Sequence, residues 1–264
     1  MGHHKRKEKK RNSAEADRAA HSAGMARRVL SMVVEILPIA AVFLVARVAV
    51  AETYRIPTGS MEPTIQVGDW LVVNKLRFGP HIPFTKTALP GYAEPKRSDV
   101  VVFVSPPQDL EIRITPTDVT PTLVKRIVGV GGDTLLMRDG HLWVNGRLVP
   151  PLNTDFSIPE NGSEPHRLFE WQQALEVRGS RFGSPVATPS LHHWGPLVVP
   201  AGMLFMMGDN RDNSVDSRYY GPVPRENVRG APVFVYYSYD TEGGVNFVRA
   251  FTEIRWRRLG TRIR

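Results

Sequence analysis

Short apolar runs separated by Gly, Pro and Asp turns recur along the chain after residue 51. The runs are four to eight residues long and rich in Val, Ile, Leu and aromatic residues, which is typical of β-strands. Two dipeptides typical of tight hairpin turns, Asp139-Gly140 and Asn145-Gly146, lie between such runs. The pattern predicts a mainly β protein, with strands at 70–75, 99–104, 123–130, 134–138, 141–144, 204–207 and 232–237.

A change of composition divides this β-rich region. Residues 150–200 contain more Pro, Gly, Ser and His than the flanking segments, and only 168–177 suggests a short helix. We expect an antiparallel β core formed by residues 51–136 and 201–252, with residues 137–200 inserted as a smaller subdomain. About 200 residues are enough to bury a core without disulfides, and the chain has no cysteine.

One long apolar stretch, from Val29 to Val50, precedes the β-rich region and contains only Ser31, Glu35 and Arg47 as polar side chains. Its 22 residues would span about 33 Å as a helix, enough for the hydrocarbon core of a bilayer. A charge at the bilayer centre costs about 2.5 to 3.5 kcal/mol, so Glu35 opposes insertion, whereas Arg47 is close enough to the end to reach the interface. We expect a transmembrane helix at 29–50, with a buried core helix as the alternative.

The formal net charge of +8 is concentrated at the two ends of the chain. Residues 1–28 carry +6 and residues 253–264 carry +4, which leaves about −2 for the remainder. A nucleic-acid-binding protein is expected to carry a basic patch on its folded body, so we expect no nucleic-acid partner. The basic N-terminal tail indicates a cytoplasmic N-terminus, with the residues after the apolar stretch outside the cytoplasm. Residues 253–264 are interpreted as a solvated basic tail, with contact between Arg255-Trp-Arg-Arg258 and anionic lipid headgroups as the alternative.

Ser60 is the candidate nucleophile because it lies in a turn-forming segment ten residues beyond the apolar stretch. Pro57 and Gly59 are typical of a kinked backbone that exposes a serine hydroxyl, although the same segment without a partner would be a turn with Ser60 as a helix cap. At neutral pH a serine needs a base. The sequence has no GxSxG motif, no HExxH motif, and no carboxylate close to His192-His193 that would indicate a metal site.

Lys125 is the candidate base. A lysine must lose its proton before it can accept one, which requires a pKa near 7 or 8 instead of about 10.4. Burial among apolar side chains provides such a decrease. In a strand, Leu123, Lys125 and Ile127 point to one face and Arg126 to the other, so the lysine has apolar neighbours on its own side. The alternative is a strand lysine whose stem packs while its ammonium group reaches water.

A polar turn from Gly208 to Arg218 contains three Asp, two Asn, two Ser and two Arg. A calcium-binding EF-hand loop requires Gly at its sixth position and Glu at its twelfth, and this segment provides neither from Asp209 or from Asp212. We therefore interpret the segment as a structural turn whose side chains orient other residues of a site.

These residues resemble the type I signal peptidases, the membrane-anchored serine endopeptidases that remove signal peptides from exported proteins. The resemblance covers the apolar stretch and motifs at 54–64, 69–75, 99–103, 124–133 and 208–224, in the family's order. It implies that Ser60 is the nucleophile and Lys125 the general base. An oxyanion hole is implied at the backbone N–H of Ser60 and the hydroxyl of Thr58, where the family more often has serine.

The resemblance also implies roles for neighbouring residues. Ser214 is expected to orient the lysine, with support from Asp209, Asp216 and Arg218. Shallow pockets for small side chains at positions −1 and −3 of the signal peptide are expected to be lined by Ile56, Pro57, Met61, Ile65, Leu123 and Val124.

The implied function is removal of signal peptides from exported preproteins by a monomeric, single-pass enzyme of the cell membrane, without a metal or cofactor. A LexA-like Ser-Lys autoprotease is an alternative, but it would need an upstream DNA-binding helical domain where this chain has a basic tail and an apolar stretch. A catalytically inactive, membrane-tethered β module is a second alternative, and the presence of Ser60, Lys125 and Ser214 argues against it.

Overall fold

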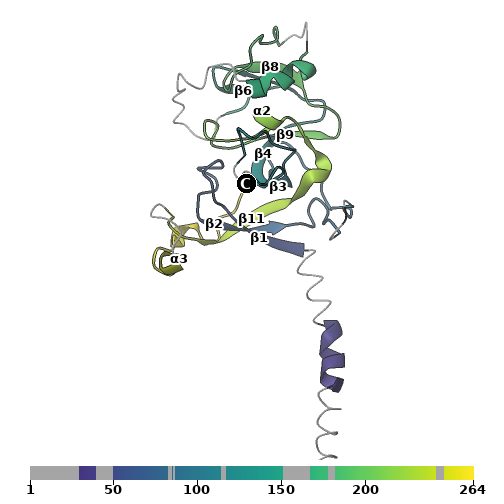
Figure 1. The fold of residues 1–264 in the computed structure, drawn as a ribbon, viewed down its shortest axis with the longest axis vertical. Coiled ribbons are helices and arrows are strands. Elements are labelled where there is room, and N and C mark those ends of the chain that lie inside the picture. Colours follow the sequence, from purple (N-terminus) through teal and green to yellow (C-terminus); the bar gives the residue numbers. More distant parts are fainter. Residues whose placement is uncertain are drawn as a thin grey trace, which may run out of the picture. The chain divides into compact units, whose positions relative to one another are not determined.

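The computed structural model describes residues 30–39, 50–82, 85, 87–113, 117–150, 167–177, 182–241 and 247–264. The chain divides into two compact units, Met1–Val48 and Ala49–Arg264. The larger unit is mainly antiparallel β-structure, which confirms the mainly β part of the predicted fold class (Figure 1).

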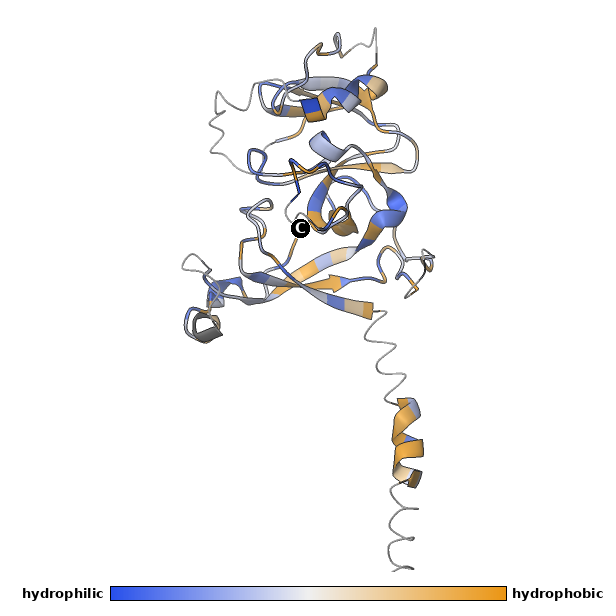
Figure 2. Ribbon diagram, in the orientation of Figure 1, coloured by the Kyte–Doolittle hydropathy of each residue, from blue (hydrophilic) through white to orange (hydrophobic). Residues whose placement is uncertain are grey.

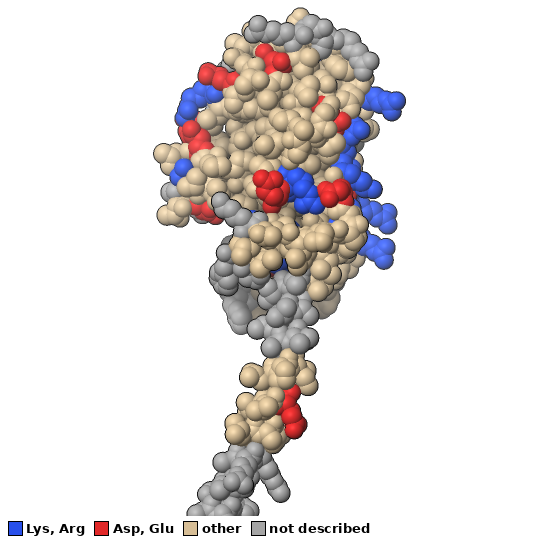
Figure 3. Space-filling model, turned by 90° about the vertical axis from the view of Figure 1, so that its right-hand side faces the viewer, with Lys and Arg blue, Asp and Glu red and all other residues tan. Residues whose placement is uncertain are grey.

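In the smaller unit, residues 30–39 are helical and mostly apolar, and Glu35 is their single charged residue (Figures 2 and 3). Within the described part of the chain, no helix is both long and apolar enough to cross a membrane. The transmembrane helix predicted at 29–50 falls partly outside the described residues, because residues 29 and 40–49 are not among them. The tail predicted at 1–28 lies entirely outside them.

A seven-stranded sheet in the order β1-β2-β11-β3-β4-β9-β10 forms the base of the larger unit, and all its pairings are antiparallel. Its central strands β3, β4 and β9 are buried on both faces, which explains their continuous apolar runs in the sequence. The strands are β1 (Ala51–Arg55), β2 (Asp69–Asn74), β3 (Val100–Val104), β4 (Thr122–Val130), β9 (Met203–Met207), β10 (Val223–Pro224) and β11 (Val228–Ser238).

A second, four-stranded sheet has the order β7-β6-β5-β8. Asp139-Gly140 joins β5 to β6 and Asn145-Gly146 joins β6 to β7, and all four turn residues have the positive φ that two-residue hairpins require. Both predicted hairpin turns are therefore confirmed. The strands are β5 (Thr134–Arg138), β6 (His141–Val144), β7 (Arg147–Leu148) and β8 (Trp194–Val198).

This smaller sheet begins at Thr134, three residues before the predicted boundary at 137, because β5 pairs with β6 and β8 and not with the larger sheet. The segment predicted as a short helix forms the 3-10 helix η2 (Arg167–Leu175). The remaining short helices are α2 (Ser217–Tyr220), η3 (Arg225–Asn227), α3 (Phe247–Thr252) and η4 (Trp256–Arg258).

A shared hydrophobic core joins the two sheets. Phe205 and Met207 of β9 pack with Leu135 of β5 and Trp194 of β8. The rings of Trp194 and Phe205 are stacked with their centroids 5.5 Å apart. The smaller sheet is therefore fixed to the strand that leads directly into the polar turn after Met207.

Residues 253–264, which the charge count assigned to a solvated tail, are instead packed against the larger sheet. The N–H groups of Gly260 and Ile263 donate to the carbonyls of Val235 and Val233 in β11. Arg258 forms a close ion pair with the buried carboxylate of Asp69. A charge count along the sequence does not reveal this pair because its members are 189 residues apart.

Candidate active site

Ser60 lies in the turn that connects β1 to β2. The turn is closed at its base by a hydrogen bond from the N–H of Ile56 to the carbonyl of Asp69, 2.9 Å long. After Ser60 the backbone makes a single helical turn, in which the N–H of Ile65 donates to the carbonyl of Met61 at 2.9 Å. Met61 and Ile65 are buried in a hydrophobic cluster under this turn, so the segment around the serine is fixed by packing.

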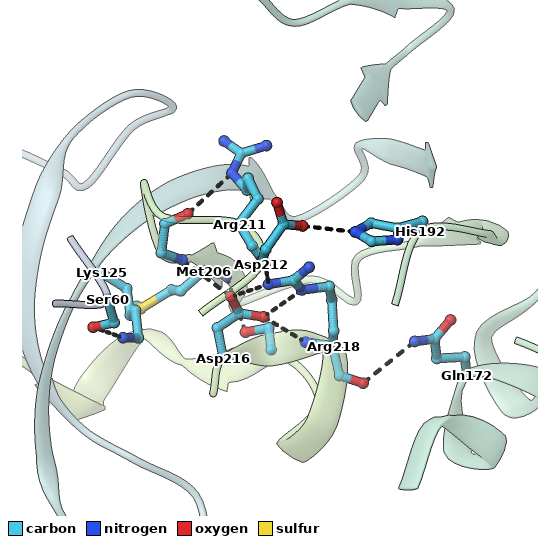
Figure 4. Close-up of polar contacts among 11 residues, drawn as sticks. Ser60, Lys125, Gln172, His192, Met206, Arg211, Asp212, Asp216 and Arg218 are labelled. Atoms are coloured by element: carbon cyan, nitrogen blue, oxygen red, sulfur yellow. Dashed lines mark hydrogen bonds and ion pairs between the residues drawn. The ribbon is translucent and has the colours of Figure 1, made fainter. Parts of the chain in front are cut away.

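Lys125 reaches Ser60 from the middle of β4. Its Nζ donates a hydrogen bond to Ser60 Oγ at 2.5 Å, although the two residues are 65 positions apart in the sequence (Figure 4). Only 3% of Lys125 is exposed to solvent. Burial lowers its pKa from 10.5 to about 8, because the nearby carboxylates of Asp216 and Asp209 only partly offset the loss of hydration. The site thus brings a hydroxyl and an amine that is readily deprotonated into direct contact.

Asp216 and Arg218 form a fully buried ion pair within the polar turn (Figure 4). Two guanidinium nitrogens of Arg218 each donate to a different carboxylate oxygen of Asp216 at 2.8 Å. Burial by itself raises the pKa of Asp216, but the charge of Arg218 and the N–H of Gly208 outweigh that effect and lower the pKa below its usual value. The carboxylate is therefore ionised at neutral pH and holds the turn together.

The inserted segment also contacts this ion pair. Trp171 Nε1 and Gln172 Nε2 of η2 donate to the carbonyl oxygen of Arg218 at 3.1 and 3.3 Å. His192 Nε2 lies 2.7 Å from a carboxylate oxygen of Asp212. The predicted subdomain is therefore connected to the turn through three polar side chains.

Asp209 connects the polar turn to both the Ser60 turn and β4. It accepts two hydrogen bonds from the guanidinium of Arg126, at 2.8 and 2.7 Å, and one from Thr64 Oγ1 at 2.6 Å. Asn210 adds two contacts of 3.2 Å, from its N–H to the carbonyl of Ser60 and from its side-chain amide to the carbonyl of Gly59. These bonds fix the backbone that carries the serine.

Gly208 provides the closest approach between the two turns. A Cβ at this position would clash with the carbonyl oxygen of Ser60 and with the side chain of Ser214. Ser214 therefore lies close to the backbone of Ser60, but its buried Oγ has no hydrogen-bond partner among the described residues. The role of Ser214 as the group that orients Lys125 remains a prediction.

The other expected site residues differ in accessibility. Thr58 is half-buried two residues before Ser60, and Pro57 is exposed. Ile56, Met61 and Ile65 are buried in the cluster beneath the turn. In β4, Leu123 belongs to another core cluster and Val124 is partly exposed. Pro57 and Val124 are thus the most accessible members of the predicted pockets.

The sequence interpretation gave no role to Gly208, Asn210 or Arg126. Each of them is a sequence neighbour of a residue that the motifs indicate, and this was the only sign in the sequence that they contribute to the site. Their contacts depend on how two turns meet in space, which the spacing of residues does not define.

Known proteins similar to this chain are signal peptidases. The family model described as signal peptidase, peptidase S26, matches residues 29–237. Signal peptidase I of Pseudomonas aeruginosa is 33% identical over 216 residues, covering 76% of this chain and 70% of the relative. Signal peptidase I of Pseudomonas fluorescens is 34% identical over 218 residues, with the same coverage of 76% and 70%. Signal peptidase I of Haemophilus influenzae is 30% identical over 264 residues, covering 83% of this chain and 74% of the relative.

Proposed function

Because the chain belongs to the signal peptidase family, peptidase S26, we propose that it removes the N-terminal signal peptides of exported preproteins, with Ser60 as nucleophile and Lys125 as general base. One observation carries the assignment of these two residues. The Nζ of a lysine that is 3% exposed lies 2.5 Å from the serine Oγ. The two atoms are thus within hydrogen-bond reach, which proton transfer between them requires.

In the proposed reaction, neutral Lys125 takes the proton of Ser60 as Oγ attacks the carbonyl carbon of the scissile bond. The resulting oxyanion is stabilised by the N–H of Ser60 and the hydroxyl of Thr58. When the intermediate collapses, the leaving amine takes a proton from Lys125 and departs as the N-terminus of the mature protein. Lys125 then deprotonates a water molecule, which hydrolyses the acyl-enzyme and releases the signal peptide.

The lowered pKa makes this base usable near neutral pH. With a pKa of about 8, about one Lys125 side chain in ten is neutral at pH 7. With the ordinary value of 10.5, the neutral fraction would be about 300-fold smaller. Burial of the lysine thus supplies the activation that a histidine partner provides in other serine hydrolases.

The proposal includes a membrane anchor at 29–50, a cytoplasmic N-terminus and a catalytic unit outside the cytoplasm. The length and apolar character of that stretch support the anchor, and the basic residues before it support the orientation. If the full chain is recovered in the soluble fraction after cell lysis without detergent, the anchor is refuted. A chain starting at Ala51 should lose the membrane association of the full chain.

Substrate selection is proposed to depend on shallow apolar pockets near Ser60, formed by Pro57, Val124 and Leu123 with the more deeply buried Ile56, Met61 and Ile65 behind them. A preprotein with Ala at positions −1 and −3 is expected to be processed. Replacing the −1 residue by Phe should prevent processing, since the packed cluster leaves little room for an aromatic ring.

The catalytic proposal is tested by incubating the purified full chain with a preprotein and, separately, with a mechanism-based acylating inhibitor. Wild type should process the preprotein and gain one inhibitor adduct on Ser60, located by mass spectrometry. Ser60→Ala and Lys125→Ala should each abolish processing, while Ser31→Ala is the matched control. Processing by either catalytic variant refutes the dyad, failure to acylate wild type favours the inactive module, and self-cleavage alone favours the autoprotease.

A further inference from the structure

A groove of about 460 Å³ lies at the boundary between the two sheets of the larger unit. Its volume is within the range of about 300 to 1,000 Å³ that is typical of sites for small molecules. The groove has an apolar part and a basic part, and no Asp or Glu is among its described lining residues. The lining consists of Arg97, Ser98, Arg126, Ile127, Val128, Val144, Val149, Pro150 and Arg211.

Two of the three arginines in the groove already have carboxylate partners. Arg126 donates to both carboxylate oxygens of Asp209 and to the carbonyls of Ser98 and Arg264, so its donors are largely occupied. Arg97 is half-exposed, and its Nε is 3.5 Å from the carboxylate of Asp133.

Arg211 differs from both because it has no anionic partner in the described part of the chain. Only 8% of this residue is exposed. Its Nε donates to the carbonyl of Gly208 at 3.0 Å, while Nη1 and Nη2 have no hydrogen-bond partner among the described residues. Figure 4 shows its guanidinium pointing away from the Asp216–Arg218 ion pair. Among the described residues, nothing therefore occupies the two terminal nitrogens of this arginine, which lines the groove.

The surroundings of Arg211 favour an added negative charge. Buried cations in proteins are normally paired directly with an anion, because the loss of hydration is costly. The carboxylates of Asp216 and Asp209 only partly offset that cost at Arg211. Burial, followed by repulsion from Arg218, lowers the pKa of Arg211 to about 10. An anion bound to Nη1 and Nη2 would relieve both effects. The forked geometry of a guanidinium matches the two oxygens of a phosphate or carboxylate.

We propose that this groove binds a small amphiphilic oxyanion, with its phosphate or carboxylate on Nη1 and Nη2 of Arg211 and its hydrocarbon part against Val128, Val144 and Val149. Inorganic phosphate offers only the charged part of this match. A phosphorylated hydrocarbon, including the end of a phospholipid, offers both parts. The volume of the groove and its apolar wall favour the second source.

Calorimetric titration of the full chain in a neutral detergent tests the proposal, with hexyl phosphate, inorganic phosphate and hexanol as probes. Hexyl phosphate should bind saturably at one site, more tightly than inorganic phosphate, and hexanol should not compete with it. Arg211→Gln should weaken the binding of hexyl phosphate about ten- to a hundredfold, because a charged hydrogen-bonding partner is lost. Arg257→Gln removes an exposed arginine elsewhere and is the matched control.

Val149→Glu provides a second test that does not alter Arg211. The new carboxylate should occupy the groove and abolish the binding of hexyl phosphate in a variant whose cooperative unfolding shows that it is folded. Unchanged binding of hexyl phosphate in folded Arg211→Gln or Val149→Glu would overturn the proposal, as would the absence of saturable binding in the wild type. Equally tight binding of inorganic phosphate would overturn the assignment to an amphiphile.

Discussion

Lys125→Met is predicted to make the protein more stable at neutral pH while it eliminates catalysis. Burial lowers the pKa of Lys125 from 10.5 to about 8, a difference of about 2.5 units. Each pKa unit corresponds to about 1.36 kcal/mol. Below pH 8, the protonated amine of buried Lys125 therefore lowers the free energy of unfolding by about 3 kcal/mol. Methionine has a similar length and no charge, so this cost disappears.

The sign of the pH dependence follows from the same shift. The unfolded chain binds the proton of Lys125 more tightly than the folded protein, so the destabilisation is complete below pH 8 and disappears above about 10.5. The variant also loses the hydrogen bond to Ser60, worth about 0.5 to 1.5 kcal/mol. The expected net gain for Lys125→Met is therefore about 2 kcal/mol at pH 6 to 7.

The measurement is guanidinium unfolding of the full chain in a neutral detergent, followed by tryptophan fluorescence between pH 6 and 10.5. The difference in free energy of unfolding between Lys125→Met and wild type should decrease by up to about 1.4 kcal/mol per pH unit above pH 8. Lys96→Met, at an exposed lysine, is the matched control and should show no such trend. A free-energy difference between Lys125→Met and wild type that does not change with pH would refute the reasoning.

Three other predictions follow from the geometry of the site. The kcat/KM for a peptide substrate should rise with pH through about 8, because the proposed base is the neutral form of Lys125; a rate that falls over this range would contradict it. Thr58→Val should lower kcat about 10²- to 10³-fold while Thr58→Ser retains most activity, and equal activity of the two variants would exclude an oxyanion role. Gly208→Ala should lower peptidase activity and also lower the free energy of unfolding by about 1 to 3 kcal/mol, because the added methyl group would displace the carbonyl of Ser60. A peptide assay and chemical denaturation measure the two effects.

Strand ends were predicted well where the sequence contains a dipeptide typical of hairpin turns. The Asp139-Gly140 and Asn145-Gly146 turns fix the ends of β5, β6 and β7, since their backbone conformations are limited to few residue types. Strand β8 was not predicted, because Trp194-Gly-Pro-Leu-Val contains two residues that normally interrupt strands. Its position depends on pairing with β5, which is distant in sequence.

The candidate site was predictable in its residue types but not in its contacts. Apolar flanking residues indicated that Lys125 is buried, and the motif indicated Ser60. Their 2.5 Å contact also needs Asp209 and Asn210 to hold the serine turn, and neither bond follows from spacing. The contacts of the C-terminal segment were even less predictable. The charge count suggests that Arg258 is solvated, whereas in the structure it pairs with the buried carboxylate of Asp69, which is distant in sequence.

The contact between Arg258 and the serine turn has a consequence for the order in which the enzyme matures. Arg258 reaches Asp69 and the carbonyl of Thr64, at sequence separations of 189 and 194 residues. A growing chain that already contains Ser60 and Lys125 still lacks these contacts until Arg258 has been synthesised and has folded against Asp69 and Thr64. The turn that carries Ser60 therefore gains its full set of contacts only after the segment around Arg258 has joined the fold.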